Sequence, residues 1–180
     1  MGRNTPLPPD ENGVSRPLDG APVTVRRATV DDAHAIAVAH VTAWREAYAG
    51  RIRADILASM DIGRFAAGWM RILEAGETDV FVAEQDGVVV GWASAGRGRD
   101  DDAPRARELE GIYVLARTYG SGAAQLLLDA AVGDAPAYLW VMDGNGRAEA
   151  FYRRNGFSRD GAATTHPVGA TSVPAVRMTR

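Results

Sequence analysis

The sequence contains no cysteine and no long apolar run. Without a thiol among its 180 residues, disulfides, thiolate metal sites and a cysteine nucleophile are all excluded. No apolar run approaches the roughly 20 residues that cross a bilayer, and residues 1–9 lack the apolar core of a secretory signal. We therefore expect a cytoplasmic protein with no membrane partner.

The chain also lacks a strong excess of charge of either sign. Its formal net charge is −3, whereas binding to a phosphate backbone needs a basic excess or a clustered basic face. Nucleic acid is therefore not an expected partner. Residues 1–21 hold four prolines and three glycines and bury too little apolar surface to fold. We predict a flexible tail over residues 1–21 and a single domain over residues 22–180.

The hydrophobic pattern changes from a helical to a strand period near the middle of the chain. It predicts a strand at 23–27, a helix capped by Thr29 and Asp32 that ends near residue 49, and helices from residues 54 and 61. The helix from residue 61 should end at Gly76 and carry Phe65, Trp69 and Ile72 on one face.

The second half of the sequence reads as strands that alternate with helices. Asp86-Gly87 predicts a hairpin between strands at 80–83 and 88–93. Further strands are predicted at 108–114, 137–142 and 172–178, with helices at 122–132 and 147–154. This order predicts an α/β fold with a mixed sheet of about six to seven strands and helices on both faces.

The most informative segment, residues 112–128, is an apolar strand, a turn with Gly120 and Gly122, and a Leu-rich helix. Such glycines let a phosphate approach bare backbone N–H groups, and the helix N-terminus adds unpaired donors and partial positive charge. The turn therefore fits a pyrophosphate, although similar turns open dinucleotide folds. A dinucleotide-dependent oxidoreductase would need Gly-x-Gly-x-x-Gly, and Gln125 stands where the third glycine belongs.

Together with residues 139–157, this segment resembles the GNAT superfamily of acyl-CoA N-acyltransferases. The family's pyrophosphate loop, Arg/Gln-x-x-Gly-x-Gly/Ala, aligns with residues 119–124, so that Tyr119 replaces the first Arg or Gln. Arg117 would begin an alternative register. The family's second motif, Leu-x-Val…Asn-x-x-Ala-x-x-Phe-Tyr-x-x-x-Gly-Phe, is matched by Leu139, Val141, Asn145, Ala148, Phe151, Tyr152, Gly156 and Phe157.

The resemblance implies a splayed sheet, the GNAT fold, with acetyl-CoA as acyl donor between the strands that end at Val114 and Met142. It implies transfer of an acetyl group to a primary amine of a small molecule or protein, by direct attack in a ternary complex and without a metal. A catalytically idle acyl-CoA-binding or sensory module on the same fold is the alternative. A homodimer is the commonest soluble assembly, and the sequence leaves the oligomeric state open.

The same resemblance assigns the residues that would contact the donor. The expected cofactor contacts are Ile112, Tyr113, Val114, Tyr119, Gly120, Ser121, Gly122, Ala123, Ala124, Asn145, Ala148, Phe151 and Tyr152. Asn145 also suits the cap of the helix that follows it. A strand N–H near Val114 or Leu115 would polarise the thioester carbonyl.

Amine acylation also needs a proton acceptor and a proton donor. Tyr152 is the candidate acid, because a phenol with a pKa near 10 stays protonated at neutral pH; alternatively it packs with Phe151. Glu108 and Glu110 are the candidate bases, acting directly or through water. They lie two apart and so share a face of a regular strand, where they could instead be plain exposed carboxylates.

Two further groups border the region where the family binds its acceptor. His40, Trp44 and Tyr48 recur every four residues and share one helix face, where they either line the acceptor pocket or form a core stripe. The run from Asp100 to Asp102 could attract a cationic amine, although such runs are usually solvated.

Overall fold

The computed structural model describes residues 21–168 and 171–180. The predicted tail therefore lies outside the described residues, except for Ala21. Its backbone hydrogen-bonds to the side chains of Gln85 and Asp86.

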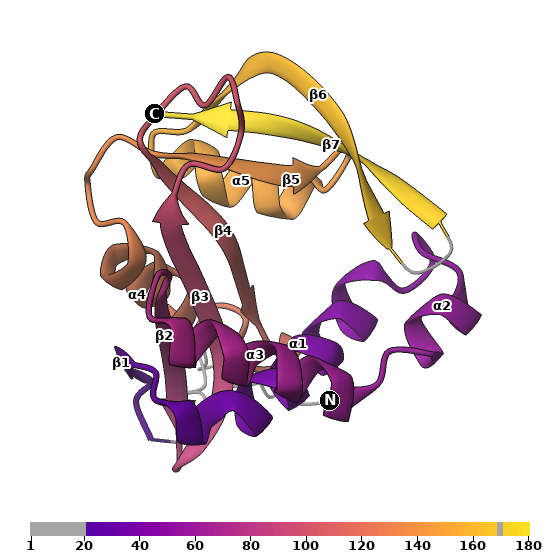
Figure 1. Cartoon of the computed structure of the whole chain (residues 1–180), viewed down its shortest axis with the longest axis vertical. Helices are drawn as coiled ribbons and strands as arrows, with labels where there is room; N and C mark the ends of the chain where they lie inside the picture. The colour runs from indigo at the N-terminus through magenta and orange to yellow at the C-terminus, as the bar shows by residue number, and fades with distance from the viewer. Residues whose placement is uncertain (1–20, 169–170) are drawn as a thin grey trace, which may run out of the picture.

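The described residues form one seven-stranded mixed sheet in the order β1-β2-β3-β4-β5-β7-β6 (Figure 1). Neighbouring strands are antiparallel except β4 and β5, which are parallel. The mixed α/β sheet is thus confirmed. The strands are β1 (Thr24–Arg27), β2 (Asp79–Gln85), β3 (Val88–Arg97), β4 (Arg107–Val114), β5 (Tyr138–Met142), β6 (Ser158–Val168) and β7 (Thr171–Thr179).

Strand β6 has no counterpart among the strands predicted from the sequence. Its residues are exposed almost throughout, and only Val168 at its end is buried. An edge strand that buries neither face shows no apolar alternation, and this is why the pattern did not reveal it.

The helices cover both faces of the sheet, as predicted. Helices α1 and α3 pack on one face, while α4 and α5 contribute to the core on the other. The helical segments are η1 (Val30–Asp32), α1 (Ala33–Tyr48), α2 (Ala54–Ala58), α3 (Ile62–Ala75), η2 (Ala116–Thr118), α4 (Ala123–Ala131) and α5 (Gly146–Arg154).

Local signals placed most of these boundaries correctly. The Asp32 carboxylate accepts a hydrogen bond from the Thr29 N–H at 2.7 Å, and Gly76 ends α3 in a left-handed conformation. Asp86 and Gly87 both have positive φ, 52° and 73°, as a tight hairpin turn requires.

One prediction for α3 is wrong. Trp69 is buried, but Ile72 is 38% exposed. Leu73 packs into the core with Phe65 and Trp69 instead, because residues four apart lie more nearly above one another along this face.

Strands β4 and β5 separate along their length and leave a gap in the sheet. These strands pair only at Glu108↔Tyr138 and Leu109↔Leu139 and then diverge, which is the predicted splay. The β3–β4 register shifts between Ser94 and Ala95, so Glu110 is an extra, bulged residue.

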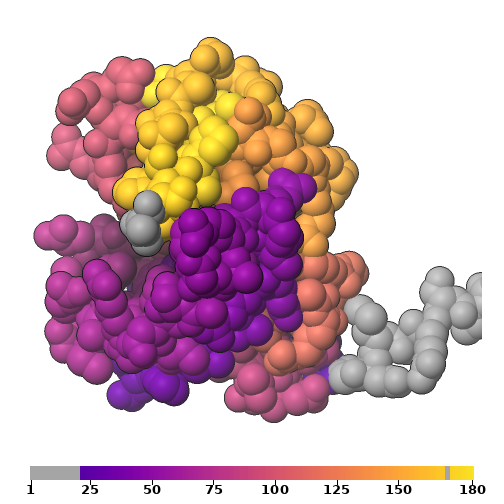
Figure 2. Space-filling model, turned by 90° about the vertical axis from the view of Figure 1, so that its right-hand side faces the viewer, coloured from indigo at the N-terminus to yellow at the C-terminus, as the bar shows by residue number. Residues whose placement is uncertain are grey.

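The far end of the gap is closed by the hairpin of β6 and β7. Val168 of this hairpin packs with Tyr48, Ile52 and Leu57 of the α1–α2 region. Figure 2 shows the yellow hairpin seated against the purple α1–α2 segment, with a hollow between the loop near residue 100 and the helices below it.

Candidate active site

A cavity of about 590 Å³ occupies the gap between β4 and β5. Its walls come from α1, β4, β5, the turn before α4, helix α5 and the β6–β7 hairpin. The cavity gathers most of the predicted donor contacts, namely Ile112, Tyr113, Val114, Tyr119, Gly120, Gly122, Ala123, Ala124, Asn145, Ala148, Phe151 and Tyr152. Ser121 is the exception, because its hydroxyl turns back to the Thr118 carbonyl at 2.7 Å.

The turn before α4 offers unpaired backbone donors. Gly120 and Gly122 have φ values of 82° and 86°, which favour glycine, and a Cβ at either position would point into open space. Within the described residues, the N–H groups of Gly120, Gly122, Ala124 and Gln125 donate no hydrogen bond. An anion at a helix N-terminus accepts from donors of this kind.

A cation from another element lies over the first residue of this loop. The Arg147 guanidinium stacks on the Tyr119 ring at 3.8 Å and donates to its hydroxyl at 2.7 Å. Arg154 also lines the cavity, and neither arginine forms an ion pair within residues 21–168 and 171–180. Sequence reasoning missed Arg147, because it fills a variable position of the second motif.

The strand edge that faces the gap carries free peptide groups. The Leu115 N–H donates to the Val90 carbonyl at 2.9 Å, so it cannot polarise a ligand in the gap. Peptide groups alternate between the two edges of a strand. The N–H groups of Ile112 and Val114 therefore point toward β5. Of the two N–H groups predicted to polarise the thioester carbonyl, only that of Val114 faces the gap.

Tyr152 lies in the wall of the cavity. It is 7% exposed, and its ring packs against Phe151 and Phe157 at centroid distances of 5.4 and 5.9 Å. Its hydroxyl hydrogen-bonds to no described residue, and burial, followed by the charge of Tyr48, raises its pKa further above the ordinary value. The phenol is therefore protonated at neutral pH.

Two more tyrosines meet beside it. The hydroxyls of Tyr48 and Tyr113 are 3.0 Å apart, and burial raises the pKa of both. The predicted acceptor residues Trp44 and Tyr48 line the cavity.

His40 does not line the cavity, although it shares a helix face with Trp44 and Tyr48. Its ring lies among Phe65, Trp92 and Tyr113 at centroid distances of 4.8, 4.7 and 5.8 Å, and its Nδ1 accepts from Trp69. Burial lowers the pKa of His40 to about 4, so the ring is neutral at neutral pH. For His40, therefore, the structure supports the alternative of a core residue and not a position in the acceptor pocket.

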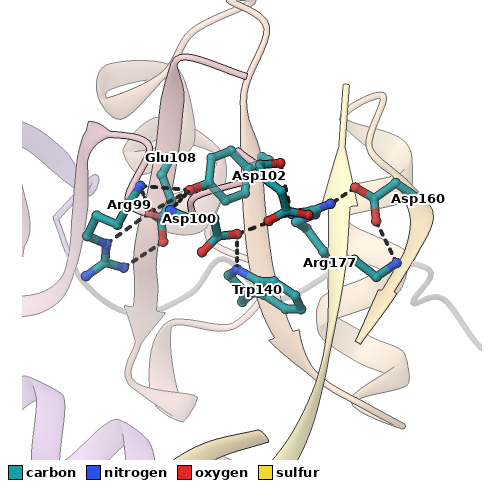
Figure 3. Close-up of polar contacts among 9 residues, drawn as sticks. Arg99, Asp100, Asp102, Glu108, Trp140, Asp160 and Arg177 are labelled. Carbon is teal, nitrogen blue, oxygen red and sulfur yellow. Dashed lines mark hydrogen bonds and ion pairs between the residues drawn. The ribbon is translucent and has the colours of Figure 1, made fainter. Parts of the chain in front are cut away.

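Glu108 is buried and fully engaged. Arg99 binds its carboxylate through Nε and Nη2 at 3.0 and 2.6 Å, and the Tyr138 hydroxyl donates to it at 3.0 Å (Figure 3). Burial alone would raise the pKa of Glu108, but the hydrogen bonds and charge of Arg99 outweigh it and lower the pKa. The alternative of a plain exposed carboxylate is wrong for Glu108, which is 2% exposed.

Glu110 is the more available of the two carboxylates. It lines the cavity, its closest cation is Arg99 with Nε at 3.9 Å, and it accepts no hydrogen bond from the described residues. The bulge does not separate Glu110 from Glu108, because both carboxylates approach the same guanidinium.

Of the aspartates before β4, Asp101 and Asp102 are exposed, as the solvated interpretation expects, but Asp100 and Asp102 also form specific contacts. Figure 3 shows Asp100 pointing to Trp140 and Arg177 lying between Asp102 and Asp160. Asp100 accepts from Trp140 Nε1 at 2.9 Å, and the buried Arg177 pairs with Asp102 and Asp160 at 3.1 and 2.8 Å. These contacts attach the loop before β4 to β5 and β7. The only sequence signal was an arginine in the apolar run of β7.

Asn145 caps α5 and lines the cavity at the same time. Its side-chain oxygen accepts from the Ala148 N–H at 3.3 Å, so the capping alternative holds together with the predicted cavity position.

Within the described residues, no group of acidic, histidine or cysteine side chains is arranged to hold a metal ion. Among the helices of residues 21–168 and 171–180, none is long and apolar enough to span a bilayer.

The sequence profile of the Acetyltransferase (GNAT) family matches residues 37–157. The chain belongs to this family. The uncharacterized N-acetyltransferase YuaI of Bacillus subtilis is 34% identical over 130 residues, which cover 68% of this chain and 73% of YuaI. The uncharacterized N-acetyltransferase Rv2669 of Mycobacterium tuberculosis is 34% identical over 91 residues, 47% of this chain and 56% of that protein.

Solved structures of GNAT proteins share the fold. A ribosomal-protein-alanine N-acetyltransferase from Brucella melitensis has a TM-score of 0.66 at 22% identity, covering 87% of this chain and 98% of that one. PaiA N-acetyltransferase from Thermoplasma acidophilum, solved with coenzyme A, has a TM-score of 0.64 at 14% identity and covers 89% of this chain and 100% of that one. The protein is thus a GNAT acyltransferase whose splayed sheet and cavity lie where the family motifs fall.

Proposed function

We propose that this GNAT enzyme transfers an acetyl group from acetyl-CoA to a primary amine by direct attack in a ternary complex. The observation that carries the proposal is one continuous cavity that joins a turn with free N–H groups to a protonated phenol and to Glu110, which accepts no hydrogen bond from the described residues. The turn would hold the donor's phosphates, and Tyr152 and Glu110 would act at its thioester.

Charge and strand geometry support acetyl-CoA as the donor. The pyrophosphate would accept from the free N–H groups of Gly120, Gly122 and Ala124, with Arg147 and Arg154 as cations nearby. The pantetheine arm would run along the open edge of β4, where the peptide groups of Ile112 and Val114 have no strand partner. The relative solved with coenzyme A supports the same donor class.

The reaction then needs two protons to leave the amine nitrogen and one to reach the departing thiolate. Glu110, directly or through water, accepts a proton from the ammonium, and the neutral nitrogen attacks the thioester carbonyl carbon. The Val114 N–H stabilises the developing oxyanion. As the C–S bond breaks, Tyr152 donates its proton to the thiolate of CoA. The attacking nitrogen then loses its second proton, directly or through water, to the Tyr152 phenolate, which restores the phenol and leaves a neutral amide. Glu108 is the weaker candidate base, since Arg99 and Tyr138 already occupy its oxygens.

Initial-rate kinetics test this function. Free CoA release is measured with varied acetyl-CoA and varied amine, and direct attack predicts intersecting double-reciprocal lines. Parallel lines would indicate an acyl-enzyme and contradict the proposed mechanism. Binding of acetyl-CoA without acetylation of any amine in a broad panel would instead favour the idle-module alternative.

A further inference from the structure

The half of the cavity away from the turn before α4 is walled mainly by apolar and aromatic side chains. We call this region the acceptor half. Its walls come from α1, the start of β4, β5 and the β6–β7 hairpin. Trp140 and His166 pack edge to face at 5.9 Å with their rings nearly perpendicular, at 81°, which places two aromatic rings on one wall. The remaining apolar lining includes Trp44, Tyr48, Met142, Pro167, Val168 and Val173.

The acceptor half holds very little unpaired negative charge. Glu108 is neutralised by Arg99, and Asp100 and Asp102 are bound by Trp140 and Arg177 and do not line the cavity. Glu110 remains as the one lining carboxylate without a hydrogen bond from the described residues. A site that selected a polyamine or an aminoglycoside would need several carboxylates, because each buried ammonium needs its own partner.

The walls and the charge together restrict the acceptor. We propose that it is a small primary monoamine on an aromatic or bulky apolar group, with its ammonium at Glu110 and its apolar body against Trp140 and His166. This inference rests on the proposed function. An amino acid is disfavoured as acceptor, because the Arg99 guanidinium that could bind its carboxylate already donates two hydrogen bonds to Glu108.

A panel of defined amines tests the acceptor class. Free CoA release at saturating acetyl-CoA is compared for 2-phenylethylamine, tryptamine, putrescine, spermidine, phenylalanine and kanamycin. Since the chain contains no lysine, acetylation of its own lysine side chains cannot add to the signal. We expect kcat/KM for the two arylalkylamines to exceed that for the other four by about 10-fold or more, the scale of burying a ring in an apolar pocket.

A pair of variants at one exposed position tests the charge argument. His166→Glu adds a second carboxylate to the aromatic wall, and His166→Gln changes the same side chain without charge. We expect the ratio of kcat/KM for putrescine to that for 2-phenylethylamine to rise at least 10-fold in His166→Glu relative to His166→Gln. Calorimetric binding of acetyl-CoA checks that each variant is folded and keeps its donor site.

The outcomes separate this inference from the proposed function. Failure of the wild type to bind acetyl-CoA would overturn the proposed function itself. Normal acetyl-CoA binding with a preference for spermidine, kanamycin or phenylalanine, or with turnover of other amines but of neither arylalkylamine, would overturn only the acceptor class. An unchanged amine ratio between the two His166 variants would also contradict it.

Discussion

At the scale of single residues, the proposed acid and the proposed base lie in contrasting environments. Tyr152 keeps its proton because burial raises its pKa. Glu110 lies at the cavity wall and lacks the bidentate partner that Glu108 has in Arg99. The choice between the two glutamates needed the structure, because it depends on the contact between Arg99 and Glu108, which no periodic pattern in the sequence reveals.

The role of Tyr152 is tested by removing one hydroxyl. Tyr152→Phe keeps the ring that packs against Phe151 and Phe157, and it should lower kcat by roughly 10²–10⁴, the scale of a positioned general acid. The calorimetric Kd for acetyl-CoA and the melting temperature should change little. Turnover within threefold of the wild type would show that Tyr152 only packs.

The buried His40 predicts a pH dependence of stability. Its pKa is lowered from 6.5 to about 4 by burial, so the unfolded chain binds the proton more readily between these pH values. The contribution of His40 is fully present above about pH 6.5 and is lost as the pH falls toward 4, by up to about 3 kcal/mol.

Urea unfolding at pH 7, 6 and 5 measures this loss. The His40→Gln variant should show a shallower fall in the free energy of unfolding, since Gln does not titrate and still offers Trp69 an acceptor. An equal slope in the two proteins would mean that His40 is protonated without cost.

At the scale of elements, the turn before α4 and helix α5 are joined by a contact between Tyr119 and Arg147. The loop's first position holds Tyr119 where the family pattern has Arg or Gln, and Arg147 at the start of α5 stacks on it. The sequence comparison identified the loop glycines but not this cation, because the contact joins segments 28 residues apart. We infer that Arg147 supplies the positive charge that the loop itself lacks.

Arg147→Ala tests this pairing of elements. Loss of a charge-assisted contact to phosphate should weaken acetyl-CoA binding about 10-fold, while Arg147→Lys should keep part of the affinity. The affinity of the wild type should also fall as salt is raised, and that of Arg147→Ala should fall less steeply. Equal affinity and salt dependence in the wild type and Arg147→Ala would exclude a role for this cation.

At the scale of the whole molecule, local patterns predicted most elements but not the contacts that hold the two halves of the sheet together. Two local signals were correct: Asp86-Gly87 forms the predicted hairpin turn, and Thr29 with Asp32 forms the predicted helix cap. At the paired end of β4 and β5, Glu108 binds Tyr138 of β5, and Asp100 and Asp102 of the loop before β4 bind Trp140 of β5 and Arg177 of β7. Such long-range pairing leaves no periodic trace in a sequence, and neither does the exposed edge strand β6.

The central claim is that the gap between β4 and β5 binds acetyl-CoA through the turn at residues 119–124. Its most direct test is a calorimetric titration of acetyl-CoA into the wild type, Ala124→Asp and Ala124→Asn. Ala124 lines the cavity in the first turn of α4, where Asp suits the helix but repels phosphate. We chose this position because any side chain at Gly122 would strain a φ of 86°.

We predict that the wild type binds acetyl-CoA, that Ala124→Asp weakens binding at least 10-fold, and that Ala124→Asn has a smaller effect. All three proteins should melt within a few degrees of one another. Absence of binding by the wild type, or equal affinity of the Asp and Asn variants, would contradict the claim.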